Sequence, residues 1–205
     1  MKKNRMRVSE VFTSIQGEGR YIGLPQVFIR LAGCNLRCSW CDTRYAWEGG
    51  REYPMQKIID YIEKTGLKSV CITGGEPMLQ IKGLRILVER LKSRMNFVLL
   101  ETNGTKYDEA VFSKVDCVSC DIKPPSSEEK SDLEVAEKLK DKDQIKIVIS
   151  TEDDYYFAKQ FTCFEAEVFL QPTHPMKAGW VVDQVIEDKL DFRILPQLHK
   201  LLKLR

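Results

Sequence analysis

The sequence feature that most restricts the fold is an alternation of amphipathic helical segments with short apolar runs. Met55, Ile58, Ile59 and Ile62 recur at the spacing of one helical face, which predicts a helix that starts near Pro54. Further helices are expected over residues 82–95, 107–114, 132–141, 152–161 and 196–204. Strands are expected over residues 27–31, 68–73, 97–104, 116–125, 144–150, 167–172 and 191–195. This order predicts βαβ units and a mainly parallel sheet.

Polar or Gly/Pro-rich segments follow the expected strands, namely GGEP, TNG, SCDIKPP and QPTHP. Ligands bind at this edge of both open α/β sheets and α/β barrels. A chain of 205 residues is too short for a complete eight-unit barrel of about 250 residues. No repeat, low-complexity tract or linker divides it. We therefore predict one domain over residues 1–205, with an α/β fold: a partial (β/α) barrel of about six mainly parallel strands.

The charge balance excludes several partners. Lysine and arginine number 32 against 30 acidic residues, so there is no electrostatic footprint for nucleic acid or an anionic membrane. No apolar run approaches the roughly 20 residues needed to span a bilayer. The basic start MKKNRMRV is followed by a polar segment rather than the apolar core of a signal peptide. We expect a cytoplasmic protein that binds neither nucleic acid nor membrane.

Three of the seven cysteines, Cys34, Cys38 and Cys41, lie within the stretch CNLRCSWC. In a reducing compartment, clustered cysteines indicate metal binding or redox chemistry rather than disulfides. Structural zinc and most iron–sulfur clusters take four protein ligands. Two interpretations follow. Either a distant residue completes a zinc site, or one coordination position is left open for chemistry.

The other cysteines have simpler interpretations, because they lie in or beside apolar runs and can act as small hydrophobes. They are Cys71, Cys117, Cys120 and Cys163. On a strand, Cys117 and Cys120 would point to opposite faces, so we do not expect them to bind one metal together. His174 and His199 are the only histidines, and His199 is expected to be structural.

The three-cysteine loop resembles the signature of the radical S-adenosylmethionine (SAM) enzymes, with Trp40 before the last cysteine and GGEP after the next strand. The resemblance implies that Cys34, Cys38 and Cys41 hold a [4Fe–4S] cluster, whose fourth iron binds the methionine part of SAM. The two glycines would let the backbone approach the cofactor, and Glu76 would accept a hydrogen bond from its ammonium.

A longer likeness narrows the family. The segments SIQGEGRYIGLPQVFIRLAGCNLRCSWCDT, TGGEP, ETNGT, SCDIKPPSS, LQP and RILPQLHK resemble the 7-carboxy-7-deazaguanine synthases. The resemblance implies a lyase that converts 6-carboxy-5,6,7,8-tetrahydropterin to 7-carboxy-7-deazaguanine with loss of ammonia, in queuosine or archaeosine biosynthesis. It also implies three cofactors: a [4Fe–4S] cluster, SAM and Mg²⁺. A 5′-deoxyadenosyl radical made from SAM would start the ring contraction, so no protein residue is assigned as catalytic.

The resemblance assigns site residues by position. Arg30 would bind the substrate carboxylate through its guanidinium fork. Thr43 would contact Mg²⁺, and oxygens of substrate and water would complete the coordination shell of the ion. The substrate contacts are expected to be Ile15, Gln16, Gly17, Arg30 and Thr73. The SAM contacts are expected to be Trp40, Asp42, Gly75, Glu76, Ser119, Asp121, Lys123 and Gln171.

The expected partners are the pterin, an external electron donor and a second copy of the chain, which the apolar C-terminal helix could bind. Two alternatives stay open. A glycyl-radical activase-like enzyme would share the cysteine loop and GGEP, but it would not need IQGEG, Arg30 or Thr43. A non-catalytic iron–sulfur or zinc-binding module would not need GGEP, and its metal content would not respond to SAM.

Overall fold

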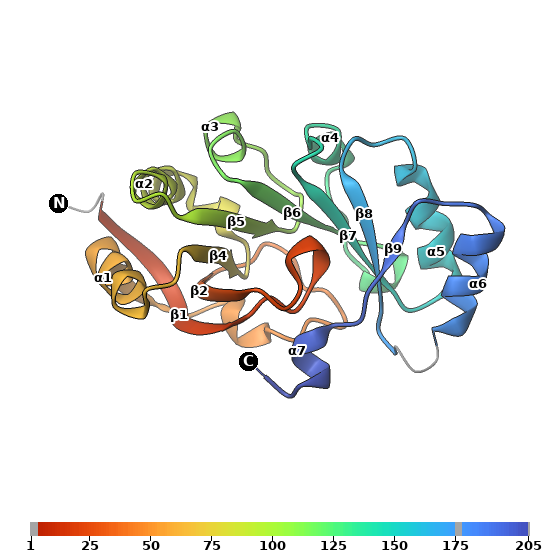
Figure 1. Cartoon of the computed structure of the whole chain (residues 1–205), viewed down its shortest axis with the longest axis horizontal. Helices are drawn as coiled ribbons and strands as arrows, with labels where there is room; N and C mark the ends of the chain where they lie inside the picture. The colour runs from red at the N-terminus through yellow and green to blue at the C-terminus, as the bar shows by residue number, and fades with distance from the viewer. Residues whose placement is uncertain (1–3, 175–177, 205) are drawn as a thin grey trace.

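The strands build one curved sheet, with helices along its outer side (Figure 1). The computed structural model describes residues 4–174 and 178–204, and within these the sheet has nine strands in the order β3-β1-β2-β4-β5-β6-β7-β8-β9. The strands are β1 (Arg5–Ile15), β2 (Pro25–Leu31), β3 (Arg51–Pro54), β4 (Ser69–Gly74), β5 (Phe97–Thr102), β6 (Cys117–Ile122), β7 (Gln144–Ile149), β8 (Glu167–Pro172) and β9 (Arg193–Ile194).

Strands β2 and β4 to β9 pair in parallel, while β1 pairs antiparallel with both β2 and β3. The sheet stays open, because β3 and β9 are its two edges. This confirms the predicted partial barrel: β2 and β4 to β8 are the expected long parallel strands. β1 and β3 were not predicted, and they extend the sheet on the side of β2.

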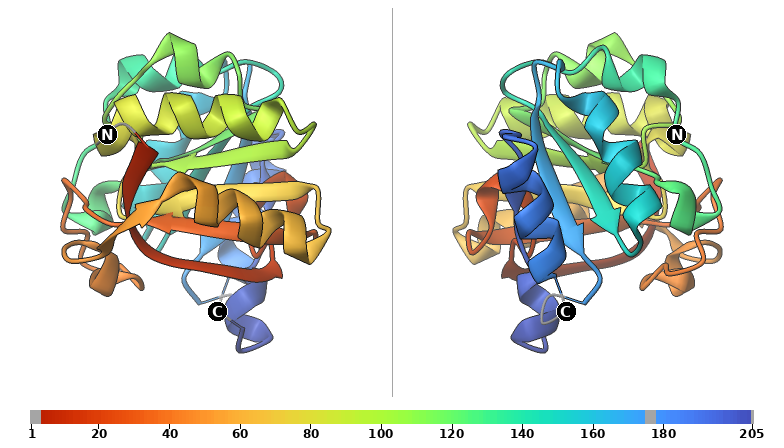
Figure 2. Two further views of the ribbon diagram at one scale, coloured as in Figure 1. Left: turned by 90° about the vertical axis from the view of Figure 1, so that its left-hand side faces the viewer. Right: turned by 90° about the vertical axis from the view of Figure 1, so that its right-hand side faces the viewer.

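Helices α1 to α6 cover the outer face of the sheet, whereas α7 lies apart from them near the C-terminus (Figures 1 and 2). The helices are α1 (Met55–Thr65), α2 (Ile81–Lys92), α3 (Glu109–Phe112), α4 (Leu133–Ala136), α5 (Glu152–Ala158), α6 (Gly179–Glu187) and α7 (Leu198–Leu201). Short 3-10 turns are η2 (Gly19–Tyr21), η3 (Arg44–Ala46), η4 (Pro77–Gln80), η5 (Pro125–Ser127) and η6 (Lys159–Phe161). Among the described residues, none of these helices has the length and apolar character to cross a membrane.

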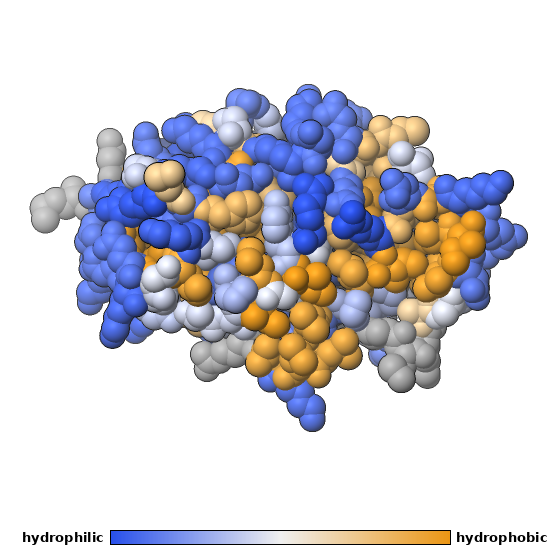
Figure 3. All heavy atoms as spheres, viewed as in Figure 1, coloured by the Kyte–Doolittle hydropathy of each residue, from blue (hydrophilic) through white to orange (hydrophobic). Residues whose placement is uncertain are grey.

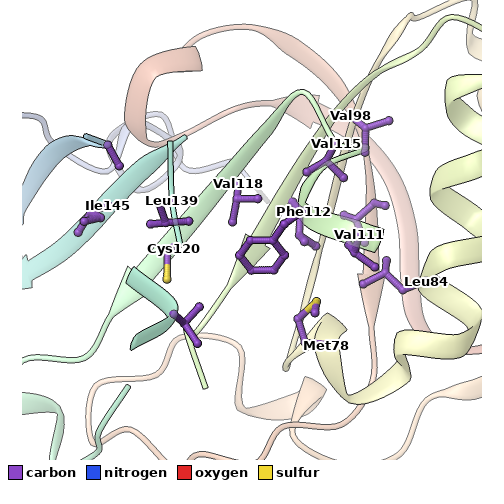
Figure 4. Close-up of a cluster of buried hydrophobic side chains, with 14 of the residues drawn as sticks. Met78, Leu84, Val98, Val111, Phe112, Val115, Val118, Cys120, Leu139 and Ile145 are labelled. Atoms are coloured by element: carbon purple, nitrogen blue, oxygen red, sulfur yellow. The ribbon is translucent and has the colours of Figure 1, made fainter. Parts of the chain in front are cut away.

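Alternate side chains of the strands enter two cores. Val70 and Ile72 of β4 point to the large core beneath the helices, whereas Cys71 between them joins a small cluster with Phe12 and Phe28. Figure 4 shows part of the large core, where side chains of β5 and β6 meet those of α2 and α3. Burial on both faces explains why these strands read as continuous apolar runs in the sequence.

The two cysteines of β6 follow the same alternation. Cys117 lies in the small cluster and Cys120 in the large core. Both are fully buried, which confirms the prediction that they point to opposite faces of the sheet. Within the described chain all seven cysteines are free thiols.

Several helices are shorter than predicted. Residues 132–141 form a helix only over Leu133–Ala136, because the chain is then drawn into a turn by Asp143. The Asp143 carboxylate accepts hydrogen bonds from the backbone N–H of Lys140 at 3.0 Å and of Val118 at 2.7 Å. α1 matches its prediction: its four apolar residues are buried, and Gly66 caps it in the left-handed conformation.

Candidate active site

A cavity of about 780 Å³ opens at the carboxyl ends of the parallel strands. Its wall includes Thr73 from β4, Glu101 from β5, Asp121 from β6, Lys146 from β7 and Gln171 from β8. The cysteine loop and the C-terminal segment close its remaining sides. Ligands of α/β proteins bind at this edge, so the cavity is the candidate active site.

The predicted ligands Cys34, Cys38 and Cys41 all line this cavity. They lie in the loop that follows β2, which has no helix or strand of its own. Backbone bonds hold the loop to neighbouring segments: the N–H of Cys34 donates to the carbonyl of Trp47 at 3.1 Å, and that of Ser39 donates to Ser127 at 3.1 Å. Among the described residues, no three His, Cys, Asp or Glu side chains gather closely enough to hold a single metal ion.

The thiols lie in a partly desolvated environment. Burial raises the pKa of Cys34 above its usual value and that of Cys38 to about 11. Both thiols are therefore protonated at neutral pH in the chain without metal. Iron must displace these protons, because the thiolate is the ligand.

Gly75 and Glu76 fix the cysteine loop against the end of β4. A Cβ at Gly75 would lie 2.3 Å from the carbonyl oxygen of Gly33 and 2.8 Å from that of Ala46. Only glycine fits this contact. The next residue, Glu76, donates its N–H to the Gly33 carbonyl at 2.7 Å.

The Glu76 side chain, a predicted SAM contact, is held by protein groups. It is fully buried and does not line the cavity. Its carboxylate accepts from the backbone N–H of Met78 and Asn103 at 2.8 and 2.7 Å, and from the Thr102 hydroxyl at 2.9 Å. Burial raises its pKa, although these hydrogen bonds oppose the shift. The Glu76 carboxylate ties the ends of β4 and β5 together.

Arg30 reaches the cavity from β2 and is held in place by aromatic and acidic neighbours. Its Nε donates to Oε1 of Glu10 at 2.9 Å. Its guanidinium lies over the rings of Phe12 and Tyr45, 5.7 and 6.0 Å from their centroids. Its side chain is 14% exposed. The predicted carboxylate-binding residue therefore presents an oriented cation to the cavity.

Beside the predicted substrate segment lies a network of paired charges. This network was not predicted from the sequence. The ammonium of Lys146 pairs with the carboxylate of Glu18 and lies 4.0 Å from that of Glu101. Gln16 donates to Glu101 at 3.2 Å. Glu18 and Glu101 belong to quoted motifs, and Lys146 interrupts the apolar run QIKIVI of β7. The sequence signal that could have indicated this network is a lysine inside an apolar strand, because lysine is rarely buried without a partner.

The pKa values of this network follow from its pairing. Burial would raise the pKa of Glu18, but the charge of Lys146 and hydrogen bonds from Lys146 and Gln197 hold it well below its usual value. Burial would lower the pKa of Lys146, but Glu18, Glu101 and Asp121 raise it well above its usual value. Both groups are ionised at neutral pH.

The predicted SAM contacts form a second polar group on the wall. Lys123 donates to Oδ2 of Asp121 at 2.7 Å and lies over the Trp40 ring, 5.2 Å from its centroid. Oδ1 of Asp121 and Nε2 of Gln171 are buried, and neither has a hydrogen-bond partner among the described residues. Such atoms are costly unless a ligand or solvent pairs with them. Ser119, another predicted SAM contact, is fully buried, does not line the cavity and accepts a hydrogen bond from Gln144 at 2.8 Å.

The C-terminal segment lies across the cavity beside the substrate segment. The N–H of Leu198 donates to the carbonyl of Gly17 at 2.9 Å, and Gln197 donates to Glu18 at 2.6 Å. Lys200 pairs with Asp42 at 3.3 Å. His199, which was predicted to be structural, lines the cavity.

Thr43 and Ile15, the remaining predicted site residues, also line the cavity. The Thr43 hydroxyl lies 3.7 Å from the sulfur of Cys41, which places the predicted magnesium contact beside the cysteine loop.

The fold and the three-cysteine loop define a radical SAM protein. A model of the radical SAM superfamily matches residues 28–154. The fold resembles the crystal structure of QueE from Escherichia coli, with a TM-score of 0.77 and 23% identity over 95% of each chain. It also resembles SuiB of Streptococcus suis, with a TM-score of 0.57 over 80% of this chain and 46% of that one.

Curated relatives give the closer assignment. The 7-carboxy-7-deazaguanine synthase of Thermoplasma acidophilum is 36% identical over 96% of this chain and 97% of its own. That of Aquifex aeolicus is 35% identical over the full length of both. The chain belongs to the 7-carboxy-7-deazaguanine synthase family of the radical SAM superfamily. Membership favours the interpretation in which three cysteines leave one coordination position open.

Proposed function

We propose that the chain converts 6-carboxy-5,6,7,8-tetrahydropterin to 7-carboxy-7-deazaguanine with release of ammonia, as a lyase of queuosine or archaeosine biosynthesis. One observation carries this proposal. The three thiols of the cysteine loop, the oriented Arg30 and the partly buried carboxylates Glu18 and Glu101 line one cavity. Such a site can hold a radical-generating centre at the thiols, next to a nitrogen-rich heterocycle that carries a carboxylate.

The residues present fit a [4Fe–4S] cluster and SAM. Cys34, Cys38 and Cys41 would hold the cluster, and the buried unpaired atoms of Asp121 and Gln171 supply an acceptor and a donor to a polar ligand. Trp40 offers an aromatic face on the same wall. When bound, the two groups supply one-electron radical chemistry. The chain itself positions the ligands and excludes water.

The substrate would be read at two ends. Arg30 has its Nε engaged by Glu10, which leaves the terminal nitrogens to meet a carboxylate bidentately. At the other end, Glu18 and Glu101 are acceptors and the Gln16 amide can both donate and accept. The 2-amino-4-oxopyrimidine edge of a pterin carries N–H donors that match these carboxylates. Thr73 donates to Glu101 at 2.8 Å and would keep that carboxylate oriented.

Mg²⁺ belongs to this proposal through Thr43. Its hydroxyl lies 3.7 Å from the sulfur of Cys41, and substrate and water oxygens would supply the other ligands that Mg²⁺ prefers. Thr43→Val should therefore raise the Mg²⁺ concentration needed for half-maximal turnover. An unchanged Mg²⁺ dependence would remove Thr43 from the proposal.

The remaining partners are an external electron donor and a second copy of the chain. Apolar side chains gather over the C-terminal helix (Figure 3), where Leu201, Leu202 and Leu204 are 55%, 53% and 46% exposed. We propose that this face forms a homodimer, which sedimentation of the wild type and of Leu201→Asp would test. The free thiols fit a reducing compartment, so the cytoplasm is the proposed location.

The deciding experiment is anaerobic reconstitution with iron and sulfide, followed by addition of SAM, reductant, Mg²⁺ and the pterin. The proposal expects a spectroscopic change on adding SAM and ammonia release that depends on the pterin. SAM cleavage with no pterin-dependent ammonia would favour an activase-like enzyme. Bound metal with no response to SAM would favour a non-catalytic iron–sulfur or zinc module.

A further inference from the structure

Two arginines and one tryptophan brace the cysteine loop, and the tryptophan, Trp47, also lines the cavity. The guanidiniums of Arg37 and Arg44 lie over the ring of Trp47, 5.1 and 5.5 Å from its centroid. Arg37 lies inside the loop and immediately precedes Cys38, whereas Arg44 and Trp47 follow the loop. Indole is the aromatic face that best attracts such cations. We call these three residues the Trp47 clamp.

Each member of the clamp also bonds to the backbone of the loop. Nη1 of Arg37 donates to the carbonyls of Cys34 and Leu36, both at 2.9 Å. Nη2 of Arg44 donates to the carbonyl of Ser39 at 2.6 Å. The backbone carbonyl of Trp47 accepts from the N–H of Cys34 at 3.1 Å. The clamp thus holds the peptide groups of Cys34, Leu36 and Ser39.

The loop needs such support, because it has no regular secondary structure. Its three thiols must reach one cluster in fixed positions, and free loop residues lose conformational entropy when they are ordered. The neighbouring acids do not replace the clamp. Glu48 pairs with the Arg37 guanidinium at 3.2 Å, and Glu129 accepts from the Arg37 N–H at 2.5 Å. These contacts steady Arg37 but do not bridge it to Arg44.

We propose that Arg37, Arg44 and Trp47 are positioning residues that hold the cysteine loop in its cluster-binding shape before the cluster is present. The inference rests on the proposed cluster-binding role of the loop. It adds that the shape is built by the chain and is not created by the metal. A pre-organised loop pays less ordering cost when it binds its ligand.

The test compares hydrogen exchange of residues 34–41 in the full chain prepared without iron. Trp47→Leu and Arg44→Gln should each speed exchange of the Cys34 amide at least tenfold, and Trp47→Tyr should largely restore protection. The same variants should take up iron and sulfide more slowly, and should show a broadened electron paramagnetic resonance signal after reduction.

Two matched controls separate this effect from general damage. Trp180→Leu removes a tryptophan that packs on Tyr155, and Arg51→Gln removes an arginine that lies over Tyr53, 5.4 Å from its centroid. Neither should change exchange in the loop. Equal exchange in Trp47→Leu, Arg44→Gln and the wild type would overturn the proposal. Because exchange is read without iron, a wild type that fails to bind a cluster would refute the proposed function and leave this result standing.

Discussion

Glu10 and Arg30 stand opposite each other on the antiparallel strands β1 and β2, and Nε of Arg30 donates to Oε1 of Glu10 at 2.9 Å. The Tyr45 hydroxyl donates to the same oxygen at 2.6 Å. Glu10 therefore fixes one edge of the guanidinium of a residue that lines the cavity. Glu10 belongs to β1. This antiparallel strand therefore contributes to the site although it is not one of the parallel strands of the barrel.

Replacement of Arg30 by alanine should weaken substrate binding far more than SAM cleavage. A charge-assisted hydrogen bond contributes about 1.5–3 kcal/mol, so KM for the pterin should rise roughly 10- to 100-fold. Steady-state ammonia release gives KM, and 5′-deoxyadenosine formation without substrate gives the SAM reaction. Glu10→Gln, which keeps a hydrogen-bond acceptor, should raise KM less. Equal loss of both reactions in Arg30→Ala would contradict its assigned role.

The buried pair of Lys146 and Glu18 should behave as a linked unit. Lys146→Met leaves the Glu18 carboxylate without its buried cation, and breaking such a pair costs about 3–5 kcal/mol of folding stability. Urea unfolding of the cluster-free chain would measure this cost. The double variant Lys146→Met/Glu18→Gln should recover a large part of it, because no uncompensated charge then remains at Glu18. Additive losses in the double variant would show that the two residues are not coupled.

The same pair predicts a pH dependence of stability. The folded-state pKa of Glu18 lies below its ordinary value of 4.5, so its contribution is complete above about pH 4.5 and is lost as the pH falls below that value. The raised pKa of Lys146 has no effect in this range, because that group stays protonated. Between pH 6 and 3, Glu18→Gln should lose less unfolding free energy than the wild type, by about 2 kcal/mol. Parallel pH profiles would contradict this assignment.

Helices and strands were predicted best where the local residue pattern agrees with the contacts that the element makes in the fold. α1 formed as expected, because its apolar face is complete and Gly66 ends it. β1 was not predicted: buried Met6 and Val8 alternate with polar residues, as in a half-buried strand, but the alternation does not continue through the segment RMRVSEVFTSI. α6 was missed as well, and it packs Val181 and Val185 against the large core.

The sequence predicted which segments meet at the cavity, whereas the direction of individual side chains could not be predicted from it. The cysteines and Arg30 line the cavity, since their motifs fix their position at strand ends. Glu76 in GGEP and Ser119 in SCDIKPP turn inward, where they pair with protein groups. Side-chain direction at a strand end depends on the neighbouring strand, which a motif does not specify. Lys146 was missed because its partners lie on β5 and before η2.

Gly75 provides the sharpest test of how the cysteine loop is seated. Gly75→Ala would place a Cβ 2.3 Å from the Gly33 carbonyl oxygen, so the loop must move away from β4. We expect a loss of about 1–3 kcal/mol in unfolding free energy, as for other overpacked sites, together with lower iron content after reconstitution. The matched control is Gly179→Ala in α6, where a Cβ meets no atom within 4 Å. That control should keep full iron content and gain a little stability, because alanine favours helix. Normal iron content in Gly75→Ala would show that the loop can bind its cluster without the close contact to β4.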